Sequence, residues 1–547
     1  MSTQKLLKKA ARCWKEGDKK GTIKAYKRII SIEPNHYRAL NNLASIEFIA
    51  KNYAAAEALL KQAVKVEPDL SEAHINLGNI YSMTEQLDLA IKTFTDVIRI
   101  EPNSYIAYHQ LGLNYLKLKE LNDALNAINM SISINPGNAG LFILLGQILE
   151  AKDMLNEAIG AYSQALKIQP THISALTHLA AAFLSMGDKS KAISVYETAL
   201  RYYPDELSIH YYLSGLASKY LNSELQDKVE AALSSENEIP STISNALFLK
   251  AKFAHQNCDY VLEMELLSQA HAKFLETKNF QKGTQYYLNE LQHYADKKPS
   301  TFDKEGIAKV SRKELSPIFI VGAPRSGSTL IENIICAADK EIKKGEETSV
   351  IDNEMFKFLK LDKAEKNYQE LGQSVLTRYE EKKLLSSTRF TDKSLENIFM
   401  VGFILDLFPK ARIIYCKRNP ISSVISILQN NLGALSWAHN LDDIFKYLEN
   451  CSTAIKYWKT EYPESVYEID YDLLVTNQVD ESKKLLEFCE LLWSEDCLHF
   501  YKKKGLVSKT ASVSQIRNPI HSDSVNKFKQ YELFFSSYKE AHAWLNE

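Results

Sequence analysis

The sequence has little of what a disulfide-stapled, metal-bound or membrane-spanning protein needs. Its seven cysteines are dispersed along 547 residues, and no two are spaced as Cys-x-x-Cys. This distribution predicts neither a disulfide framework nor a zinc site; it favours free thiols in a reducing compartment, with the cytoplasm as the expected location. No apolar run approaches the roughly 20 residues of a membrane-spanning helix. Residues 5–11 are basic and amphipathic without the apolar stretch of a secretory signal, so we interpret them as part of a first helix.

The chain also lacks a charge excess of either sign. It has 66 lysines and arginines against 68 aspartates and glutamates, for a net charge of −2. Proteins that bind nucleic acid through its phosphates usually carry a basic excess, so no nucleic-acid partner is predicted. With 45% hydrophobic and 24% charged residues, the composition is that of a globular protein, and the length predicts two to four domains.

Prolines recur at a constant interval in the first part of the chain. They stand at positions 34, 68, 102, 136, 170 and 204, each 34 residues from the last. This is the period of the tetratricopeptide repeat, a unit of two helices. Small residues such as Gly78 and Gly146 would let the two helices approach, and aromatics such as Phe94 and Tyr162 would fill the space beside them. Proline after the second helix would end it.

A single unit of this kind cannot bury its apolar face, so stacked neighbours must complete the core. We therefore predict an α-solenoid over residues 1–298, less regular after Pro204, and a polar linker over 299–316. Such arrays usually bind peptides or partner proteins. This one would either recruit an acceptor protein or serve only as a scaffold.

Residues 317–547 are enough for one α/β domain. Apolar segments at 318–321, 412–416 and 466–469 predict strands, and helices are expected at 329–337 and 422–429. The alternation of the two predicts a parallel sheet with helices on both faces. Ligands in such folds bind beyond the carboxyl ends of the strands, so the loops after the first two strands should face one site.

The loop after the first of these strands carries the clearest signal of function. Gly322-x4-Gly327-Ser328-Thr329 has the spacing of a phosphate-binding P-loop, except that Ser328 stands where a nucleoside triphosphatase has lysine. Backbone N–H groups at the start of the following helix would favour an anion. With Arg325 as its cation, the loop suits an anion less charged than a triphosphate, such as a phosphosulfate. The missing lysine argues against the alternative of a kinase or triphosphatase.

The segment 323–329 resembles the 5′-phosphosulfate loop of sulfotransferases that use 3′-phosphoadenosine 5′-phosphosulfate (PAPS). Its Pro-Arg-Ser-Gly-x-Thr form is similar to that of protein-tyrosine sulfotransferases and of bacterial tetratricopeptide-repeat sulfotransferases. The resemblance implies a P-loop-like sulfotransferase domain without a catalytic metal. It assigns the binding of the 5′-phosphosulfate to Arg325, Ser326, Gly327, Ser328 and Thr329.

Further motifs resemble cofactor-binding segments of the same family. Arg418, after the second predicted strand, and Ser426, eight residues on, match a 3′-phosphate motif, although Asn430 replaces an additional arginine. Lys527 matches a lysine that contacts the cofactor phosphates. Tyr471 matches a position near the nucleotide, with a packed strand end as the alternative.

The catalytic residues are also carried over from the resemblance. Gly345-Glu346-Glu347-Thr348 is similar to a segment whose second glutamate is taken as the general base, which favours Glu347; relatives with one glutamate would favour Glu346. Lys393 would stabilise charge on the leaving group, and Ser512 matches the serine paired with that lysine. Some sulfotransferases use histidine as the base instead, and His439 is the candidate here.

These expectations converge on transfer of a sulfuryl group from PAPS to an acceptor hydroxyl, leaving 3′,5′-phosphoadenosine. The double glutamate favours a protein tyrosine as the acceptor, while the cytoplasmic character suits a bacterial enzyme with another one. A glycan, lipid or small-molecule acceptor remains an alternative. A non-catalytic tetratricopeptide adaptor with a nucleotide-binding domain is a further alternative.

Overall fold

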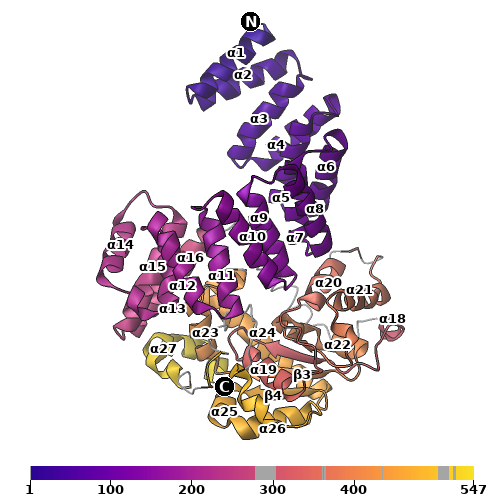
Figure 1. Ribbon diagram of the computed structural model, residues 1–547, viewed down its shortest axis with the longest axis vertical. Coiled ribbons are helices and arrows are strands. Elements are labelled where there is room, and N and C mark those ends of the chain that lie inside the picture. Colours follow the sequence, from indigo (N-terminus) through magenta and orange to yellow (C-terminus); the bar gives the residue numbers. More distant parts are fainter. Residues whose placement is uncertain are drawn as a thin grey trace. The chain divides into compact units, whose positions relative to one another are not determined.

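The computed structural model shows two compact units (Figure 1). One comprises Met1–Phe183 with Ser190–Tyr202, and the other comprises Leu184–Lys189 with Tyr203–Glu547. The structure describes residues 2–277, 304–359, 361–362, 365–433, 435–502, 517–520 and 525–546. Within these ranges, no helix has the length and apolar character needed to cross a lipid bilayer.

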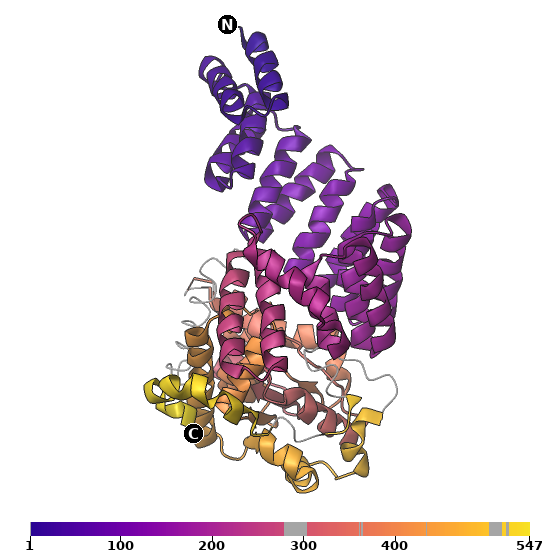
Figure 2. The same cartoon turned by 90° about the vertical axis from the view of Figure 1, so that its left-hand side faces the viewer.

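The repeats fold as successive helix pairs (Figure 2). The first helix of each of these pairs has 13 or 14 residues and the second has 14. The pairs are α1 (Thr3–Lys15) with α2 (Lys19–Ile32), α3 (Tyr37–Ile49) with α4 (Tyr53–Val66), α5 (Ser71–Met83) with α6 (Leu87–Ile100), α7 (Tyr105–Lys117) with α8 (Leu121–Ile134), α9 (Ala139–Ala151) with α10 (Leu155–Ile168), and α11 (Ile173–Met186) with α12 (Lys189–Tyr202). Each second helix ends two residues before one of the regularly spaced prolines, which confirms the predicted repeat.

Small residues bring the two helices of a pair together, as the sequence indicated. A methyl group added to Gly146 would lie 2.3 Å from the ring of Tyr162, and one added to Gly78 would lie 2.7 Å from the ring of Phe94. Both aromatic rings are fully buried. Because protein interiors are close-packed, a larger residue at either glycine would force the helices apart.

Four further helices belong to the second unit. They are α13 (Leu207–Leu216), α14 (Ser223–Ser234), α15 (Pro240–Gln256) and α16 (Tyr260–Thr277). Phe248 and Leu267, from α15 and α16, share a hydrophobic core with Phe319 of the sheet domain. The last described helix pair before residue 278 therefore packs as part of the second unit. The limit proposed at residue 298 stays a prediction, since residues 278–303 lie outside the described ranges.

The second unit contains a four-stranded parallel sheet in the order β2-β1-β3-β4. Its strands are β1 (Ile318–Gly322), β2 (Thr391–Asp392), β3 (Arg412–Lys417) and β4 (Val466–Asp470). The predicted parallel sheet is confirmed, and three of its strands begin at the expected residues. Sequence analysis missed β2 because two residues are too few to show a periodic pattern.

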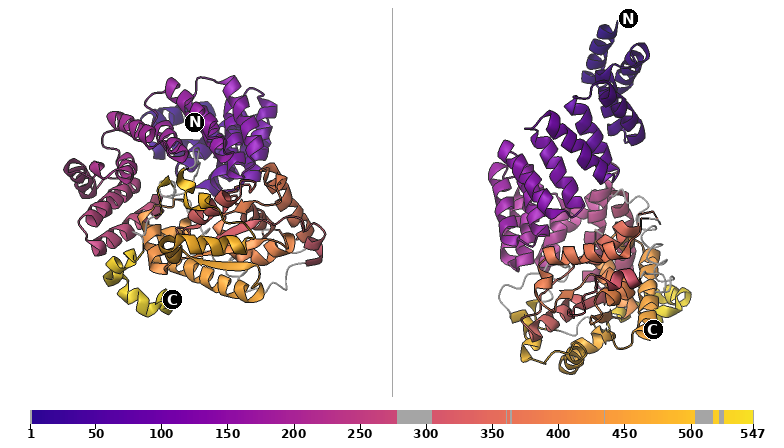
Figure 3. Two further views of the ribbon diagram at one scale, coloured as in Figure 1. Left: turned by 60° about the horizontal axis from the view of Figure 1, so that its bottom comes forward. Right: turned by 90° about the vertical axis from the view of Figure 1, so that its right-hand side faces the viewer.

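Helices cover both faces of the sheet (Figure 3). Alternate side chains of β1 point to opposite faces: Phe319 and Val321 join one core, and Ile318 and Ile320 join the other. The first core includes α20 (Val350–Leu359), α21 (Tyr368–Glu381), α22 (Val401–Leu407), α23 (Pro420–Gln429) and α24 (Leu441–Glu461), and the second includes α19 (Ser328–Ala338) and α26 (Gln478–Phe488). Because all four strands are parallel, their carboxyl ends lie at the same edge of the sheet, and the candidate site is at this edge.

Candidate functional site

The loop between β1 and α19 has the backbone of an anion-binding turn. Arg325 and Gly327 have positive φ angles of 69° and 99°, and α19 begins directly after Gly327. A Cβ atom on Gly327 would lie 2.3 Å from the ring of Tyr471, which follows β4, so the loop packs against the neighbouring strand end. Glycine is the residue that accommodates both this angle and this approach. Ser328 and Thr329 are buried at the start of α19, the end of a helix at which backbone N–H groups favour an anion.

The predicted cofactor residues from three strand ends meet beside this loop. Arg325 donates from Nε to Ser426 Oγ at 3.0 Å, and Arg418 donates from Nη1 to the carbonyl oxygen of Arg325 at 2.7 Å. The guanidinium of Arg418 lies 4.8 Å from the centre of the Tyr471 ring, a cation–π distance. Asn430 stands where the motif that this segment resembles has an additional arginine. Its side-chain amide donates to the carbonyl oxygen of Ser426, four residues earlier.

The electrostatics of this corner fit a bound anion. Burial, together with the adjacent Arg418, lowers the pKa of Arg325 to about 10, and burial also lowers the pKa of Arg418. The Nε atom of Arg418 is buried and has no hydrogen-bond partner among the described residues. Neighbouring guanidinium groups that lose solvation would be stabilised by a phosphate or sulfate, with which arginine forms paired hydrogen bonds.

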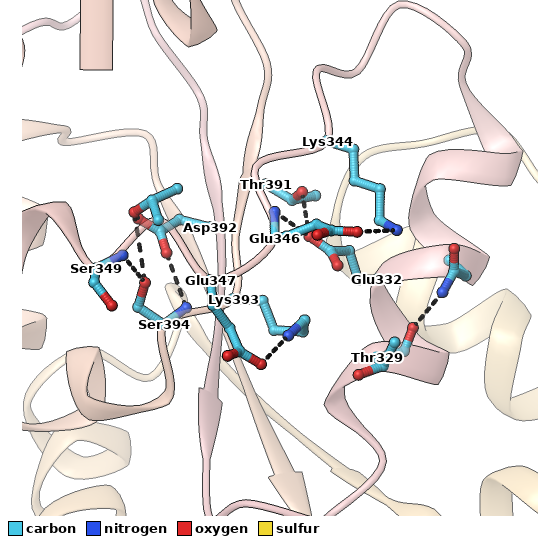
Figure 4. A network of polar contacts seen from close by, with 12 residues as sticks. Thr329, Glu332, Lys344, Glu346, Glu347, Ser349, Thr391, Asp392, Lys393 and Ser394 are labelled. Atoms are coloured by element: carbon cyan, nitrogen blue, oxygen red, sulfur yellow. Dashed lines mark hydrogen bonds and ion pairs between the residues drawn. The ribbon is translucent and has the colours of Figure 1, made fainter. Parts of the chain in front are cut away.

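Lys393, directly after β2, forms an ion pair with Glu347 of the loop between α19 and α20 (Figure 4). Lys393 Nζ contacts Glu347 Oε1 at 2.7 Å. The lysine side chain is fully buried, whereas that of Glu347 is 55% exposed. Burial lowers the pKa of Lys393, but the carboxylates of Glu347, Glu332 and Glu346 outweigh it, and the net shift is upward. The site therefore combines a buried, protonated lysine with a carboxylate that solvent can reach.

Glu332 holds this region together, and the sequence analysis did not single it out. It lies on α19, is fully buried, and accepts hydrogen bonds from Glu346 N at 3.0 Å and Thr391 Oγ1 at 2.8 Å (Figure 4). Burial raises the pKa of Glu332, against the opposing effect of Lys393 and Lys344. The Glu332 carboxylate thus links α19 both to the segment 345–349, called the acidic loop below, and to β2. Its signal in the sequence is a lone charge within an apolar helix.

The two candidate bases differ in their surroundings. Glu346 has a φ angle of 54°, its N–H is bonded to Glu332, and its carboxylate is paired with Lys344 Nζ at 3.0 Å. Glu347 instead faces Lys393 and solvent. Of the two carboxylates, that of Glu347 is the more accessible, and that of Glu346 is held within the loop.

Asp392 fixes the end of β2 from which Lys393 extends. This buried carboxylate accepts hydrogen bonds from the hydroxyls of Thr348 and Tyr379 and from the N–H of Ser394. Ser394 Oγ in turn accepts from Ser349 N at 2.8 Å. These bonds join the acidic loop to β2 on the side opposite Glu332 (Figure 4).

Of the two remaining predicted site residues, Lys527 lies within the described part of the chain. Lys527 Nζ lies 3.3 Å from Gln429 Oε1, on the helix that also carries Ser426. Lys527 therefore lies beside α23, and its contact with the 3′-phosphate stays a prediction. Ser512 lies outside the described residues.

His439, the alternative base, is a buried residue packed against α16. Its Nδ1 atom lies 2.7 Å from Nδ1 of His271, and its ring stacks on Phe274. His271 Nε2 must donate to the Leu428 carbonyl oxygen, 2.9 Å away, so in the neutral pair His271 Nδ1 accepts from His439. These contacts indicate a packing role.

The buried histidine pair predicts a loss of stability in mild acid. Burial lowers the pKa of His271 from 6.5 to about 3, so the unfolded chain binds a proton that the folded chain resists. The stabilisation is complete above pH 6.5 and declines as the pH falls towards 3. We expect the free energy of unfolding to drop by about 1.4 kcal/mol between pH 7.5 and 5.5 through this residue.

Urea unfolding of the wild type and of His271→Gln at the two pH values measures this contribution. Between pH 7.5 and 5.5, the free energy of unfolding of His271→Gln should fall by about 1.4 kcal/mol less than that of the wild type. Replacement of the exposed His499 by glutamine is the control, and the fall should then equal that of the wild type. Equal pH dependence in the wild type and His271→Gln would contradict the assignment.

Comparison with known proteins agrees with this architecture. Residues 317–495 match the Sulfotransferase family, and residues 2–246 match the Cilia and flagella-associated protein 70 C-terminal domain, a helical-repeat domain. The chain therefore combines a tetratricopeptide-like repeat region with a sulfotransferase-family domain.

Individual relatives are distant. An uncharacterized protein of Aquifex aeolicus (strain VF5) is 29% identical over 333 residues, which is 56% of this chain and 42% of that protein. Protein-tyrosine sulfotransferase A of Caenorhabditis elegans is 25% identical over 236 residues, 39% of this chain and 60% of that protein. The chain thus spans about half the length of the curated relatives it matches. The crystal structure of a tetratricopeptide repeat protein from Parabacteroides merdae ATCC 43184 aligns with 51% of this chain and 94% of its own, at 14% identity and a TM-score of 0.36.

Proposed function

We propose that this protein transfers a sulfuryl group from PAPS to an acceptor hydroxyl. The observation that carries the proposal is the meeting, at one sheet edge, of the Arg325–Arg418 corner with the Lys393–Glu347 pair. A paired guanidinium corner suits an anionic cofactor, and an exposed carboxylate beside a protonated lysine suits proton removal near a developing negative charge. The family match of residues 317–495 supports the same reaction class.

The binding residues divide between the two ends of the cofactor. Arg325 and the first-turn N–H groups of α19 would hold the 5′-phosphosulfate, with Ser326, Gly327, Ser328 and Thr329 forming the turn. The 3′-phosphate would be held by Arg418, Ser426 and Lys527. Tyr471 keeps the Arg418 guanidinium in place through its ring. When bound, PAPS supplies the activated sulfuryl group.

The catalytic steps follow from the positions of Glu347 and Lys393. Glu347 removes the proton of the acceptor hydroxyl as its oxygen forms a bond to sulfur, and the bond between sulfur and the phosphate oxygen breaks. Lys393, held protonated, stabilises the charge that this oxygen keeps in 3′,5′-phosphoadenosine. Ser512 would assist Lys393. The sulfuryl group carries less negative charge than a phosphoryl group, so these cations replace a metal ion.

The acceptor class we favour is a protein tyrosine. The double glutamate of the acidic loop and the similarity to Protein-tyrosine sulfotransferase A support this choice. The repeat region would then recruit the acceptor protein in the cytoplasm. A glycan, lipid or small-molecule acceptor would leave the repeats as a scaffold.

Transfer from ³⁵S-labelled PAPS in a cell extract tests the proposal. Label should enter the protein fraction, and Arg325→Ala should lower its rate about 100- to 1000-fold, as loss of a donor to the reacting group does. Lys309→Ala, an exposed substitution in the same unit, is the matched control. Label in the lipid, glycan or small-molecule fraction would overturn the tyrosine acceptor but not the reaction. Binding of 3′,5′-phosphoadenosine without transfer to any fraction would favour the non-catalytic adaptor.

A further inference from the structure

A buried polar cluster joins α16 to the predicted 3′-phosphate corner. At its centre is Glu263 of α16, which is 3% exposed. Its Oε1 accepts from Gln429 Nε2 at 2.7 Å, and its Oε2 accepts from the Tyr531 hydroxyl at 2.8 Å and lies 2.8 Å from His255 Nδ1. Lys527 and Tyr531 are the ends of a short 3-10 helix, η9 (Lys527–Tyr531). A carboxylate in this apolar setting needs such partners, because burial of an unpaired charge is costly.

The hydrogen bonds of the cluster determine which way the Gln429 amide points. Its Nε2 donates to both Glu263 Oε1 and the Tyr531 hydroxyl. Its Oε1 therefore faces the other side, where it accepts from Lys527 Nζ at 3.3 Å. Burial and the nearby carboxylate of Glu263 raise the pKa of Tyr531, so its hydroxyl keeps the proton that it donates. Glu263 thus sets the amide orientation that Lys527 requires.

Gln429 lies on the same helix as a residue of the cofactor corner. It follows Ser426 by three positions on α23, so the two side chains project from neighbouring parts of one helical face. Ser426 receives the Arg325 hydrogen bond. A residue that locks Gln429 therefore acts on the helix at the point where the 3′-phosphate is expected.

The charges around Lys527 reinforce this link. Burial lowers the pKa of Lys527, the Glu263 carboxylate raises it, and the Arg418 guanidinium lowers it further. His255 and Tyr531 reach the same carboxylate from α15 and η9. The negatively charged Glu263, on α16, thus favours the protonated form of Lys527.

We propose that Glu263 is a positioning residue for Lys527 and, through it, for the 3′-phosphate of the cofactor. This inference rests on the proposed function. Helix α16 precedes the sulfotransferase-family match in the sequence, and through Glu263 it would contribute to cofactor binding. Gln429 is the intermediary between the two charged side chains.

Binding of two nucleotides at two pH values tests the role of Glu263. The ligands are 3′,5′-phosphoadenosine and adenosine 5′-phosphosulfate, which lacks the 3′-phosphate. Glu263→Gln removes the charge with little change of shape, and Glu265→Gln, at an exposed position of the same helix, is its matched control. We expect Glu263→Gln to weaken binding of 3′,5′-phosphoadenosine about tenfold, the size of a lost charge-assisted contact, and to change adenosine 5′-phosphosulfate binding less than twofold.

The pH dependence and a double variant separate positioning from a purely structural role. Without Glu263 the ammonium of Lys527 should deprotonate more easily, so binding of 3′,5′-phosphoadenosine should decline at a lower pH on the alkaline side. In a Lys527→Met background, Glu263→Gln should add less than a twofold effect. If Glu263→Gln folds poorly, Gln429→Leu cuts the same link and should show the same preference for the ligand with the 3′-phosphate.

Two outcomes would overturn the inference. One is equal weakening of both ligands, and the other is unchanged binding of 3′,5′-phosphoadenosine in Glu263→Gln while Arg418→Ala still loses it. The proposed function fails differently: wild-type protein would then bind neither ligand, or Arg418→Ala would bind both normally.

Discussion

Replacement of Glu347 by glutamine is expected to lower kcat for sulfuryl transfer about 100- to 10,000-fold, the contribution of a positioned general base. The amide keeps the size of the side chain but cannot accept the acceptor's proton. Binding of 3′,5′-phosphoadenosine should change little, because the cofactor corner is built from other strand ends. Single-turnover rates with saturating PAPS, measured beside equilibrium binding, separate the two effects.

Glu346→Gln is the matched control for this experiment. Its carboxylate is paired with Lys344, while the bond to Glu332 is made by its backbone N–H, which the substitution leaves intact. We expect its kcat to fall less than about tenfold, in line with the loss of one partly exposed ion pair. If Glu346→Gln were the more damaging change, the assignment of the base would have to be reversed.

Three of the site residues that sequence analysis located share one property: each lies directly after a strand. Arg325, Arg418 and Tyr471 follow β1, β3 and β4, and parallel strands present their carboxyl ends at the same edge. Identifying the first two strands was therefore enough to predict that the loops of Arg325 and Arg418 face one site, whereas Tyr471 was expected near it only from the resemblance. The repeat period predicted the helix pairs for a similar reason, since each helix finds its main partner within its own or the next repeat.

The residues that were missed act through contacts that no local pattern encodes. Glu332 lies within an apolar helix, and its partner Thr391 is 59 residues away. Glu263 and Gln429 are 166 residues apart, on opposite sides of a segment outside the described ranges. In each case the helical pattern explains the burial of the position but gives no reason for its charge. That reason appears only when the partner is brought alongside by the fold.

Gly345→Ala is expected to disable catalysis without abolishing cofactor binding. A Cβ atom at this position would lie 2.0 Å from the carbonyl oxygen of Thr391, so the acidic loop would have to move away from β2. The loop carries Glu347 and β2 leads into Lys393, which makes their 2.7 Å contact depend on this close approach. Because displacement by about 1 Å can cost about 100-fold in rate, we expect kcat to fall by at least that factor.

Three measurements on Gly345→Ala distinguish misplacement of the loop from general unfolding. The melting temperature should remain high enough for a folded protein at the assay temperature, and 3′,5′-phosphoadenosine should bind within about threefold of the wild type, since Arg325 and Arg418 lie on other loops. Gly160→Ala is the control: a methyl group there meets no atom within 4 Å, and alanine in a helix should stabilise the protein by about 0.5–1 kcal/mol. A Gly345→Ala variant with wild-type kcat would mean that the acidic loop and Lys393 need not be held together, and the catalytic role of their ion pair would have to be abandoned.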